Sequence, residues 1–284
     1  MLRSFYAQNV SAFSRQLSVA RRRSSCVTHV YQQSTSTFSG NAVHVRCFST
    51  PSPALKNNYR CAIVGTGPSG FYTAKYLLSA FEKKEGQTCT VDLLERLPTP
   101  YGLVRYGVAP DHPEVKNVEN DFAALFSKYE SNLNFLGNVP VGESVSVEEL
   151  RTLYDVVVLS YGCESDRKLG LPGESELSGI LSAREFVAWY NGHPYFEHIG
   201  EQVANALGPE GKREVVVIGQ GNVALDCARI LSKGGRGLQD TDISSRALPV
   251  IGEDGVPLVT IVGRRGHVQG AFTIKVSSGG SRCV

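Results

Sequence analysis

The sequence contains no CxxC pair and no cysteine or histidine spacing that is typical of a zinc site. Its seven cysteines are scattered, and two of them, Cys26 and Cys47, lie near the amino terminus. These absences argue against the redox-active dithiol of disulfide reductases and against a bound metal ion. Cys61 and Cys227 fall at predicted core positions, where a small apolar thiol packs well.

Long hydrophobic runs are also missing. No stretch approaches the ~18 consecutive apolar residues of a membrane-spanning helix, so we expect no transmembrane segment. Apolar residues make up 42% and charged residues 20% of the 284 residues, which is typical of a globular protein. This length is enough for two domains of ~100–200 residues each.

Acidic side chains are absent from residues 1–58, which carry seven basic residues, and the first acid is Glu82. An Arg- and Ser-rich segment without acids is typical of a mitochondrial transit peptide. We therefore expect residues 1–57 to be a transit peptide, processed near Phe48–Pro53; the alternative is a disordered basic tail. The remaining chain has 22 basic and 27 acidic residues, a mildly acidic balance that disfavours nucleic acid as a partner.

Two glycine-rich fingerprints of the dinucleotide-binding form are present. The first, Gly65-Thr66-Gly67-Pro68-Ser69-Gly70, follows an apolar run at 61–64 that predicts a buried parallel strand. A helix is predicted after it, because apolar residues recur at helical spacing from 71 to 81. Gly65 would permit the tight turn, Gly67 would let the backbone approach a pyrophosphate, and Gly70 would let the helix and strand pack closely.

The end of the next predicted strand indicates which ribose the first fingerprint would bind. Residues 90–95 predict a strand ending in Glu95, which follows Gly70 by 25 residues, close to the ~20-residue spacing of such motifs. The Glu95 carboxylate would accept hydrogen bonds from ribose hydroxyls and would repel a 2′-phosphate. This favours the adenosine of FAD or NAD, whereas the alternative is a surface glutamate that closes a strand.

The second fingerprint is Gly219-Gln220-Gly221-Asn222-Val223-Ala224, between a predicted strand at 214–218 and a predicted helix at 222–232. A glycine-rich loop is expected at 234–237. The next predicted strand, 258–263, ends in Arg264 and Arg265 instead of an acid. Two guanidinium groups suit a 2′-phosphate, because arginine is permanently charged and binds phosphate with two parallel hydrogen bonds. The pattern therefore favours NADPH, and its alternative is a basic strand end facing solvent.

Several longer motifs resemble those of one family. They are GLVRYGVAPDHPEVKNV at 102–118, LSYG at 159–162, FVAWYNG at 186–192, GQGNVALD at 219–226 and VGRRG at 262–266. Together they resemble the adrenodoxin-type ferredoxin–NADP reductases, over about residues 60–275. The resemblance implies an α/β fold with two Rossmann-like dinucleotide-binding domains and parallel sheets. The FAD-binding part would span 58–165, closing with a strand at 156–159, and the NADP-binding part would span 166–275.

The resemblance also implies a set of site residues. Carried over by motif, the FAD contacts are Gly65, Gly67, Pro68, Ser69, Gly70, Glu95, Leu103, Arg105 and Val141. The NADP contacts are Gly219, Gln220, Gly221, Asn222, Val223, Arg264 and Arg265. His112 and Asp226 are the candidates for a direct part in the reaction, although His112 could instead fix its loop and Asp226 could satisfy a neighbour. Arg105 could approach the flavin or hold its loop in place.

The function implied by the resemblance is electron transfer from NADPH through FAD to a [2Fe–2S] ferredoxin such as adrenodoxin. Such a ferredoxin serves mitochondrial haem monooxygenases, steroid and sterol metabolism, and iron–sulfur assembly. The implied location is the mitochondrial matrix, and peripheral association with the inner membrane is compatible with it. The small subunit of glutamate synthase shares the layout with two nucleotides and stays an alternative, but its usual cysteine-rich cluster segments are absent here.

The resemblance stops after Lys275, and residues 276–284 form a divergent Ser/Gly-rich tail. Val276 stands where the family has an acid that contacts NADP. The family's FAD domain is discontinuous, so we expect this chain to lack the C-terminal half of that domain. We therefore expect weak binding of FAD and NADPH. The alternative function is that of a truncated, inactive form that acts at most as a dinucleotide-binding fragment.

Overall fold

The computed structural model describes residues 57–163, 165–209, 213–264 and 266. The chain divides into two compact units: one holds residues 57–100 and 124–161, and the other holds residues 101–123 and those from 162 onward. The predicted limits at 165 and 275 stay predictions, but residues 101–123 group with the second unit. The expected transit peptide, except residue 57, lies outside the described residues, as do Arg265 and the divergent tail.

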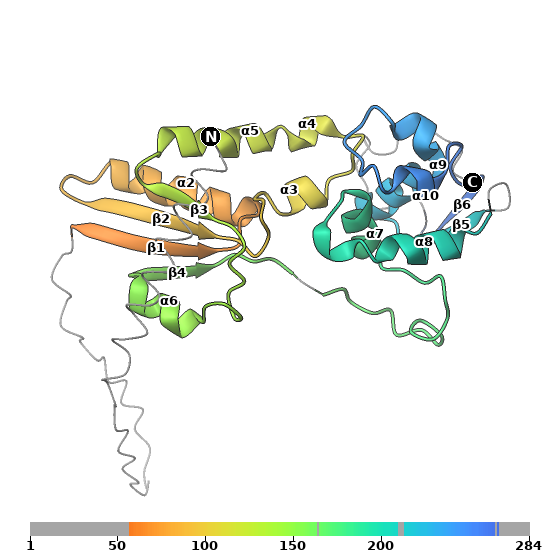
Figure 1. Ribbon diagram of the computed structural model, residues 1–284, viewed down its shortest axis with the longest axis horizontal. Coiled ribbons are helices and arrows are strands. Elements are labelled where there is room, and N and C mark those ends of the chain that lie inside the picture. The colour runs from red at the N-terminus through yellow and green to blue at the C-terminus, as the bar shows by residue number, and fades with distance from the viewer. Residues whose placement is uncertain (1–56, 164, 210–212, 265, 267–284) are drawn as a thin grey trace, which may run out of the picture. The chain divides into compact units, whose positions relative to one another are not determined.

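The first unit is a parallel four-stranded sheet in the order β3-β2-β1-β4, and Figure 1 shows its arrowheads meeting at one edge. Its elements are β1 (Asn58–Val64), α2 (Pro68–Glu82), β2 (Thr88–Leu94), β3 (Leu133–Leu136), α6 (Val147–Leu153) and β4 (Val156–Leu159). The strands predicted at 61–64, 90–95 and 156–159 and the helix after the first fingerprint are confirmed. Strand β3 and helix α6 were not predicted from the sequence.

The second half of β1, residues 61–64, is continuously apolar because both of its faces are covered. Ala62 and Val64 pack in a cluster with Leu150 and Tyr154, on the face of the sheet that α6 covers. Ile63 points to the opposite face, since side chains alternate along a strand, and it lies beside the first turn of α2. A parallel sheet buried on both faces requires such a run of apolar residues.

The strand order reverses beside β1. The chain passes from β1 to β2 and β3 on one side, and then returns as β4 on the other side, where Val64 pairs with Leu159. In open α/β sheets, ligands bind outside the carboxyl ends of the strands at such a reversal. The first fingerprint begins at this point, directly after β1.

The second unit contains a short parallel sheet and most of the helices. Its elements are α3 (Leu103–Tyr106), α4 (Pro113–Lys116), α7 (Ala183–Tyr190), the 3-10 helix η2 (Pro194–Phe196), α8 (Ile199–Leu207), β5 (Glu214–Ile218), α9 (Asn222–Leu238), α10 (Leu248–Ile251) and β6 (Leu258–Val262). Helix α5 (Val118–Lys128) begins in this unit and ends in the first. The predicted strands at 214–218 and 258–263 are confirmed.

One local expectation in the second unit was wrong. The glycine-rich stretch 234–237 is not a loop, because α9 continues through it with a kink at Gly234, whose φ is 64°. Glycine accepts this left-handed backbone conformation without strain.

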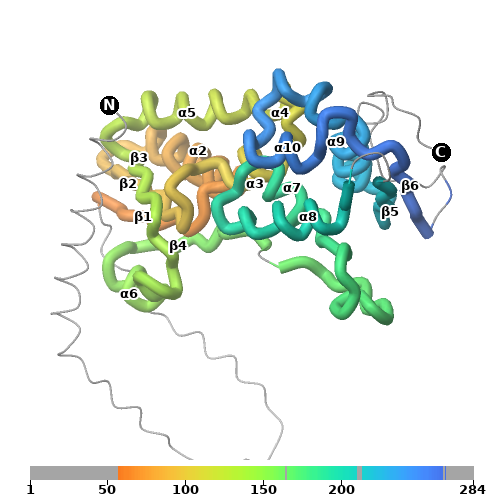
Figure 2. The backbone as a smooth tube through the Cα atoms, turned by 45° about the vertical axis from the view of Figure 1, so that its right-hand side comes forward, coloured from red at the N-terminus to blue at the C-terminus, as the bar shows by residue number. Residues whose placement is uncertain are grey.

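The core of the second unit forms where α7 and α9 meet. Fully buried Tyr190, Ile230 and Ile251 pack there with Trp189. Figure 2 shows β5 and β6 running side by side next to α9. The other face of this sheet is open, with Val216 63% and Ile218 61% exposed. In the described ranges, no helix combines the length and the apolar character needed to cross a membrane.

Candidate dinucleotide-binding sites

In the first glycine loop, two glycines have no space for a side chain, whereas the third has open space beside it. A Cβ on Gly65, whose φ is 97°, would lie 2.5 Å from the carbonyl oxygen of Ser160. A Cβ on Gly70 would lie 2.1 Å from the carbonyl oxygen of Gly65. A Cβ on Gly67 would meet no atom within 4 Å. Close packing thus requires glycine at positions 65 and 70, whereas no described protein atom fills the space beside Gly67.

The starts of the helices show which backbone donors stay uncapped. Helices α6 and α7 begin at Ser146 and Ser182, whose side chains accept hydrogen bonds from backbone N–H groups of the first turn. Helices α2 and α9 begin at Gly67 and Gly221 with no side-chain cap, a property that they share with α3, α4, α8 and α10, but among the described helices only α2 and α9 directly follow a strand through a glycine loop. The first N–H groups of a helix have no partner within the helix, and together with the helix dipole they favour an anion.

Glu95 lies just beyond β2 and is tied to the glycine loop. Its Oε2 accepts hydrogen bonds from the backbone N–H of Thr66 at 3.1 Å and from the Thr66 hydroxyl at 2.6 Å. Its Oε1 accepts the backbone N–H of Leu97 at 3.1 Å. Glu95 is 9% exposed and Thr66 is fully buried. The predicted surface alternative for this glutamate is therefore wrong.

The second glycine loop repeats part of the arrangement of the first glycine loop. Gly219 has a φ of 135°, and a Cβ on Gly221 would meet nothing within 4 Å. The side chain of Gln220 lies against Gly263 at the end of β6, where a Cβ would come within 2.1 Å of its Cδ. This contact joins the second loop to the residue that precedes Arg264. Arg264 itself is exposed.

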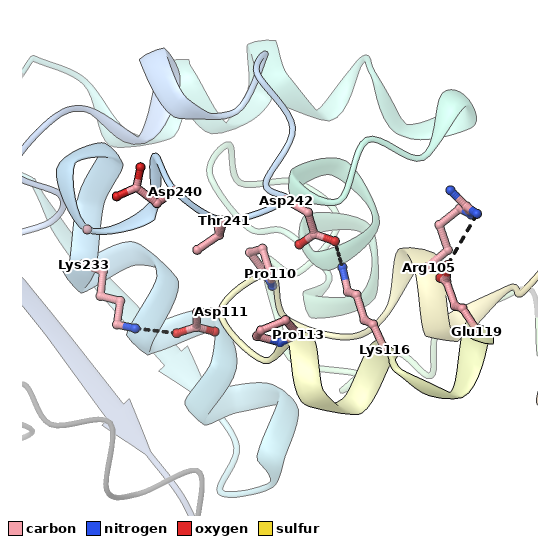
Figure 3. Close-up of a pocket in the computed structure, with 11 residues that line it drawn as sticks. Arg105, Pro110, Asp111, Pro113, Lys116, Glu119, Lys233, Asp240, Thr241 and Asp242 are labelled. Carbon is pink, nitrogen blue, oxygen red and sulfur yellow. Dashed lines mark hydrogen bonds and ion pairs between the residues drawn. The ribbon is translucent and has the colours of Figure 1, made fainter. Parts of the chain in front are cut away.

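A buried group of ion pairs fixes the loop before α4 to α9. Arg229 donates to both carboxylate oxygens of Asp111, at 2.7 and 2.9 Å, and to Asp226 Oδ1 at 2.7 Å. Lys233 Nζ donates to Asp111 Oδ2 at 2.6 Å, as Figure 3 shows. The side chains of Arg229 and Asp111 are 7% and 6% exposed. Asp226 therefore forms an ion pair with Arg229 on the same helix, which agrees with one of its two interpretations.

The ion pairs control the protonation of Asp111. Burial alone would raise the pKa of this carboxyl, but the hydrogen bonds and charges of Arg229 and Lys233 outweigh burial and hold the pKa well below its ordinary range. Because the folded pKa is depressed, the stabilisation is complete above the unfolded pKa of ~4 and is lost as the pH falls towards the folded value.

We accordingly expect the free energy of unfolding to fall steeply below a pH of about 4, and the Asp111→Asn variant to show less of this fall. The measurement is urea unfolding followed by Trp189 fluorescence, since the single tryptophan reports the second unit. Asp242→Asn is the control, because the Asp242 side chain is 56% exposed in its pair with Lys116, and a solvent-exposed carboxylate contributes little to stability. Equal acid sensitivity in wild type and Asp111→Asn would contradict the prediction.

A cavity of about 530 Å³ adjoins these ion pairs within the second unit. Figure 3 shows three pairs lining it: Lys233 with Asp111, Lys116 with Asp242, and Arg105 with Glu119. Each cation that lines the cavity is matched by a carboxylate. The cavity thus offers no surplus of positive charge for a phosphate group, unlike the two helix starts.

The remaining predicted residues take defined places. Arg105 pairs with Glu119 at 3.6 Å and lies over the Tyr101 ring at 5.4 Å. These contacts are consistent with a role in holding its loop, and its approach to a flavin stays a prediction. His112 Nδ1 lies 3.2 Å from Glu114 Oε1, while its buried Nε2 has no hydrogen-bond partner in the described part of the chain. Leu103 is exposed, and Val141 is partly buried beside the core of the first unit.

The sequence profile of one family, described as "Pyridine nucleotide-disulphide oxidoreductase", matches residues 59–278. The chain belongs to this family. Among curated members, mitochondrial NADPH:adrenodoxin oxidoreductase of Arabidopsis thaliana is 50% identical over 226 residues, covering 79% of this chain and 44% of that protein. The human protein of the same name is 50% identical over 213 residues, covering 75% and 40%.

Solved structures agree with this assignment. FprA from Mycobacterium tuberculosis in complex with NADPH superimposes with a TM-score of 0.71 at 46% identity, covering 77% of this chain and 46% of that chain. The chain thus spans less than half the length of the relatives it matches. The expected α/β fold with Rossmann-like dinucleotide-binding units is confirmed for this member of the oxidoreductase family.

Three of the four cysteines in the described residues of this family member are buried in surroundings that disfavour thiolate chemistry. Cys61, Cys89 and Cys227 are buried free thiols, and Cys163 is exposed. Burial raises the pKa of Cys61 and Cys227 to about 12 and that of Cys89 to about 11, so these thiols stay protonated at neutral pH. In the described residues, no group of three or more His, Cys, Asp or Glu side chains could hold a metal ion.

The predicted site residues fall into two groups. The first glycine loop, Glu95 and Val141 lie in the first unit, while Leu103, Arg105, His112, Asp226, the second loop and Arg264 lie in the second. Three residues were not predicted from the sequence: Thr66 and Arg229, which contact predicted site residues, and Lys233, which contacts Asp111. For Thr66, the signal was a hydroxyl inside the fingerprint. For Arg229 and Lys233, their i, i+4 spacing on α9 was visible, but their partner 118 or more residues away was not.

Proposed function

We propose that this chain supplies the FAD- and NADPH-binding parts of an adrenodoxin-type ferredoxin–NADP reductase. The observation that carries the proposal is the pair of uncapped helix starts at Gly67 and Gly221, each at the end of a parallel strand and each with open space beside the glycine. The difference between Glu95 and Arg264 at the next strand ends supports two different nucleotides.

The residues fit these nucleotides by chemistry and by space. In the first unit, the N–H groups at the start of α2 would receive the pyrophosphate of FAD, with Glu95 beside the adenosine ribose. In the second unit, the start of α9 would receive the pyrophosphate of NADPH, and Arg264 with Arg265 would bind the 2′-phosphate. His112 and Asp226 stay candidates for positioning the reacting groups.

When bound, FAD would supply the exchange between two-electron chemistry with NADPH and one-electron chemistry with a [2Fe–2S] ferredoxin. The protein's part is to hold both nucleotides and to exclude water. The names of the relatives support adrenodoxin or a related ferredoxin as the partner, and a mitochondrial location. Matrix residence, peripheral association with the inner membrane, and service to haem monooxygenases in steroid metabolism or to iron–sulfur assembly are part of the proposal.

The test uses the purified full chain mixed with FAD and then freed of unbound flavin. Retained visible flavin bands that bleach on anaerobic addition of NADPH support the proposal, and oxidation of the bleached protein by a [2Fe–2S] ferredoxin extends it to the partner. Retained bands without bleaching favour the alternative of a dinucleotide-binding fragment. A colourless protein overturns the proposal for this chain.

Arg264→Leu should weaken NADPH binding by about tenfold while leaving NADH binding nearly unchanged, because only NADPH carries the 2′-phosphate that a guanidinium binds. Binding is measured by the fluorescence of each reduced nucleotide on titration with protein. Arg236→Leu is the matched control, since Arg236 is also exposed but pairs with Glu253 and Asp254. Equal losses for NADPH and NADH would contradict the role given to Arg264.

A further inference from the structure

We propose that Thr66 is a positioning residue that aims the Glu95 carboxylate at the adenosine ribose and leaves it one oxygen to offer. The inference rests on the proposed function, since it concerns how the first unit would hold FAD. Thr66 occupies the variable position between Gly65 and Gly67, a place for which the fingerprint itself specifies no side chain.

The geometry ties Glu95 Oε2 to the loop from two directions. The hydroxyl and the backbone N–H of Thr66 both point at this one oxygen, at 2.6 and 3.1 Å. The backbone of Glu95 is held as well, because its N–H donates to Leu136 O at 2.9 Å and its carbonyl accepts from Val139 at 2.8 Å. With the backbone and Oε2 both fixed, the carboxylate has little rotational freedom.

The number of further hydrogen bonds that the Glu95 carboxylate can accept follows from counting those that it already accepts. An ionised carboxylate offers about four acceptor positions. Thr66 occupies two on Oε2, and the N–H of Leu97 occupies one on Oε1. One position on Oε1 is left, so Glu95 can accept one ribose hydroxyl and not both. The same carboxylate therefore selects the ribose and closes the glycine loop.

A purely structural role for Thr66 makes a different prediction. A valine at position 66 has nearly the same shape but lacks the hydroxyl, and a looser loop would weaken every flavin ligand by the same factor. A positioning role instead changes how strongly binding depends on one particular ribose hydroxyl. Comparing ligands that differ only in that hydroxyl separates the two roles.

The experiment measures dissociation constants of the full chain for FAD and for its analogues lacking the 2′- or the 3′-hydroxyl of the adenosine ribose. In wild type, one analogue should bind about tenfold more weakly than FAD and the other nearly as well, as expected for one hydrogen bond to a charged acceptor. In Thr66→Val, that tenfold difference should shrink to about twofold or less. Thr66→Ser should restore it, because serine keeps the hydroxyl.

Thr152→Val is the matched control, since the Thr152 hydroxyl bonds only to the backbone of α6. Its ligand ratios should equal those of wild type. An unchanged tenfold ratio in Thr66→Val, or equal losses for both analogues in wild type, would overturn the inference while leaving FAD binding intact. Failure of wild type to bind FAD at all would instead remove the proposed function, and the inference with it.

Discussion

Gly70→Ala should unfold or strongly destabilise the first unit, by about 3 kcal/mol or more, because overpacking against backbone cannot be relieved by a side-chain rotation. The added methyl group would lie 2.1 Å from the carbonyl oxygen of Gly65 and 3.6 Å from Ile63 Cγ2. The start of α2 would have to move away from β1. The measurement is urea unfolding by far-UV circular dichroism, combined with amide hydrogen exchange of residues 58–94.

Gly67→Ala is the matched control, three residues earlier in the same loop. Its φ of −75° suits alanine, and the methyl group would meet nothing within 4 Å, so stability should change by no more than ~0.5 kcal/mol. If the pyrophosphate lies beside Gly67, FAD affinity should nevertheless fall at least about tenfold. A stable Gly70→Ala variant would contradict the close packing, and unchanged FAD binding in Gly67→Ala would contradict the phosphate position.

Arg229→Met should lower the free energy of unfolding of the second unit by about 3 to 5 kcal/mol. Methionine fills much of the same space but leaves Asp111 and Asp226 without the guanidinium that both carboxylates contact. Lys233 continues to pair with Asp111, so Asp226 loses the most. Trp189 fluorescence follows the unfolding, because Trp189 packs in the core that α9 completes.

Two further variants test whether the loss comes from the buried charges. Arg236→Met breaks an exposed pair further along α9 and should cost no more than ~1 kcal/mol. The double variant Arg229→Met with Asp226→Leu should recover part of the loss, because it also removes the carboxylate that Arg229→Met leaves without a cation, while Asp111 keeps Lys233. Additive losses in the double variant would show that the two side chains do not stabilise each other.

Local sequence signals predicted the parts of the fold that depend on neighbouring residues. The strand ahead of each fingerprint and the helix behind it follow from apolar runs and glycines next to each other in the sequence. The strand ends at Glu95 and Arg264 follow 25 residues after Gly70 and 40 residues after Ala224. Strand β3 was not predicted from the sequence because its four residues include the polar Asn134. The side chain of Asn134 donates a hydrogen bond to the buried Asp92. Such a short mixed segment has no periodicity that favours a strand.

The candidate sites were predictable only in part, for a physical reason. Glu95 was found from its spacing, but the hydrogen bonds that bind it to Thr66 depend on how two loops meet at the sheet edge. Asp111 and Arg229 are 118 residues apart, and their pairing depends on which unit holds residues 101–123. No pattern within a single element contains that information.

The pairing of Asp111 with Arg229 also sets an order of events on the ribosome. The sheet of the first unit can form once β4 has been synthesised. Asp111, in contrast, can form its ion pair only after Arg229 has been synthesised, 118 residues later. At ~5–20 residues per second, this delay is about 6 to 24 seconds. During that interval Trp189 and Tyr190 have emerged without the α9 side chains that later bury them. Slow codons between 191 and 230 would therefore lengthen the period in which a chaperone or a protease can recognise the nascent second unit.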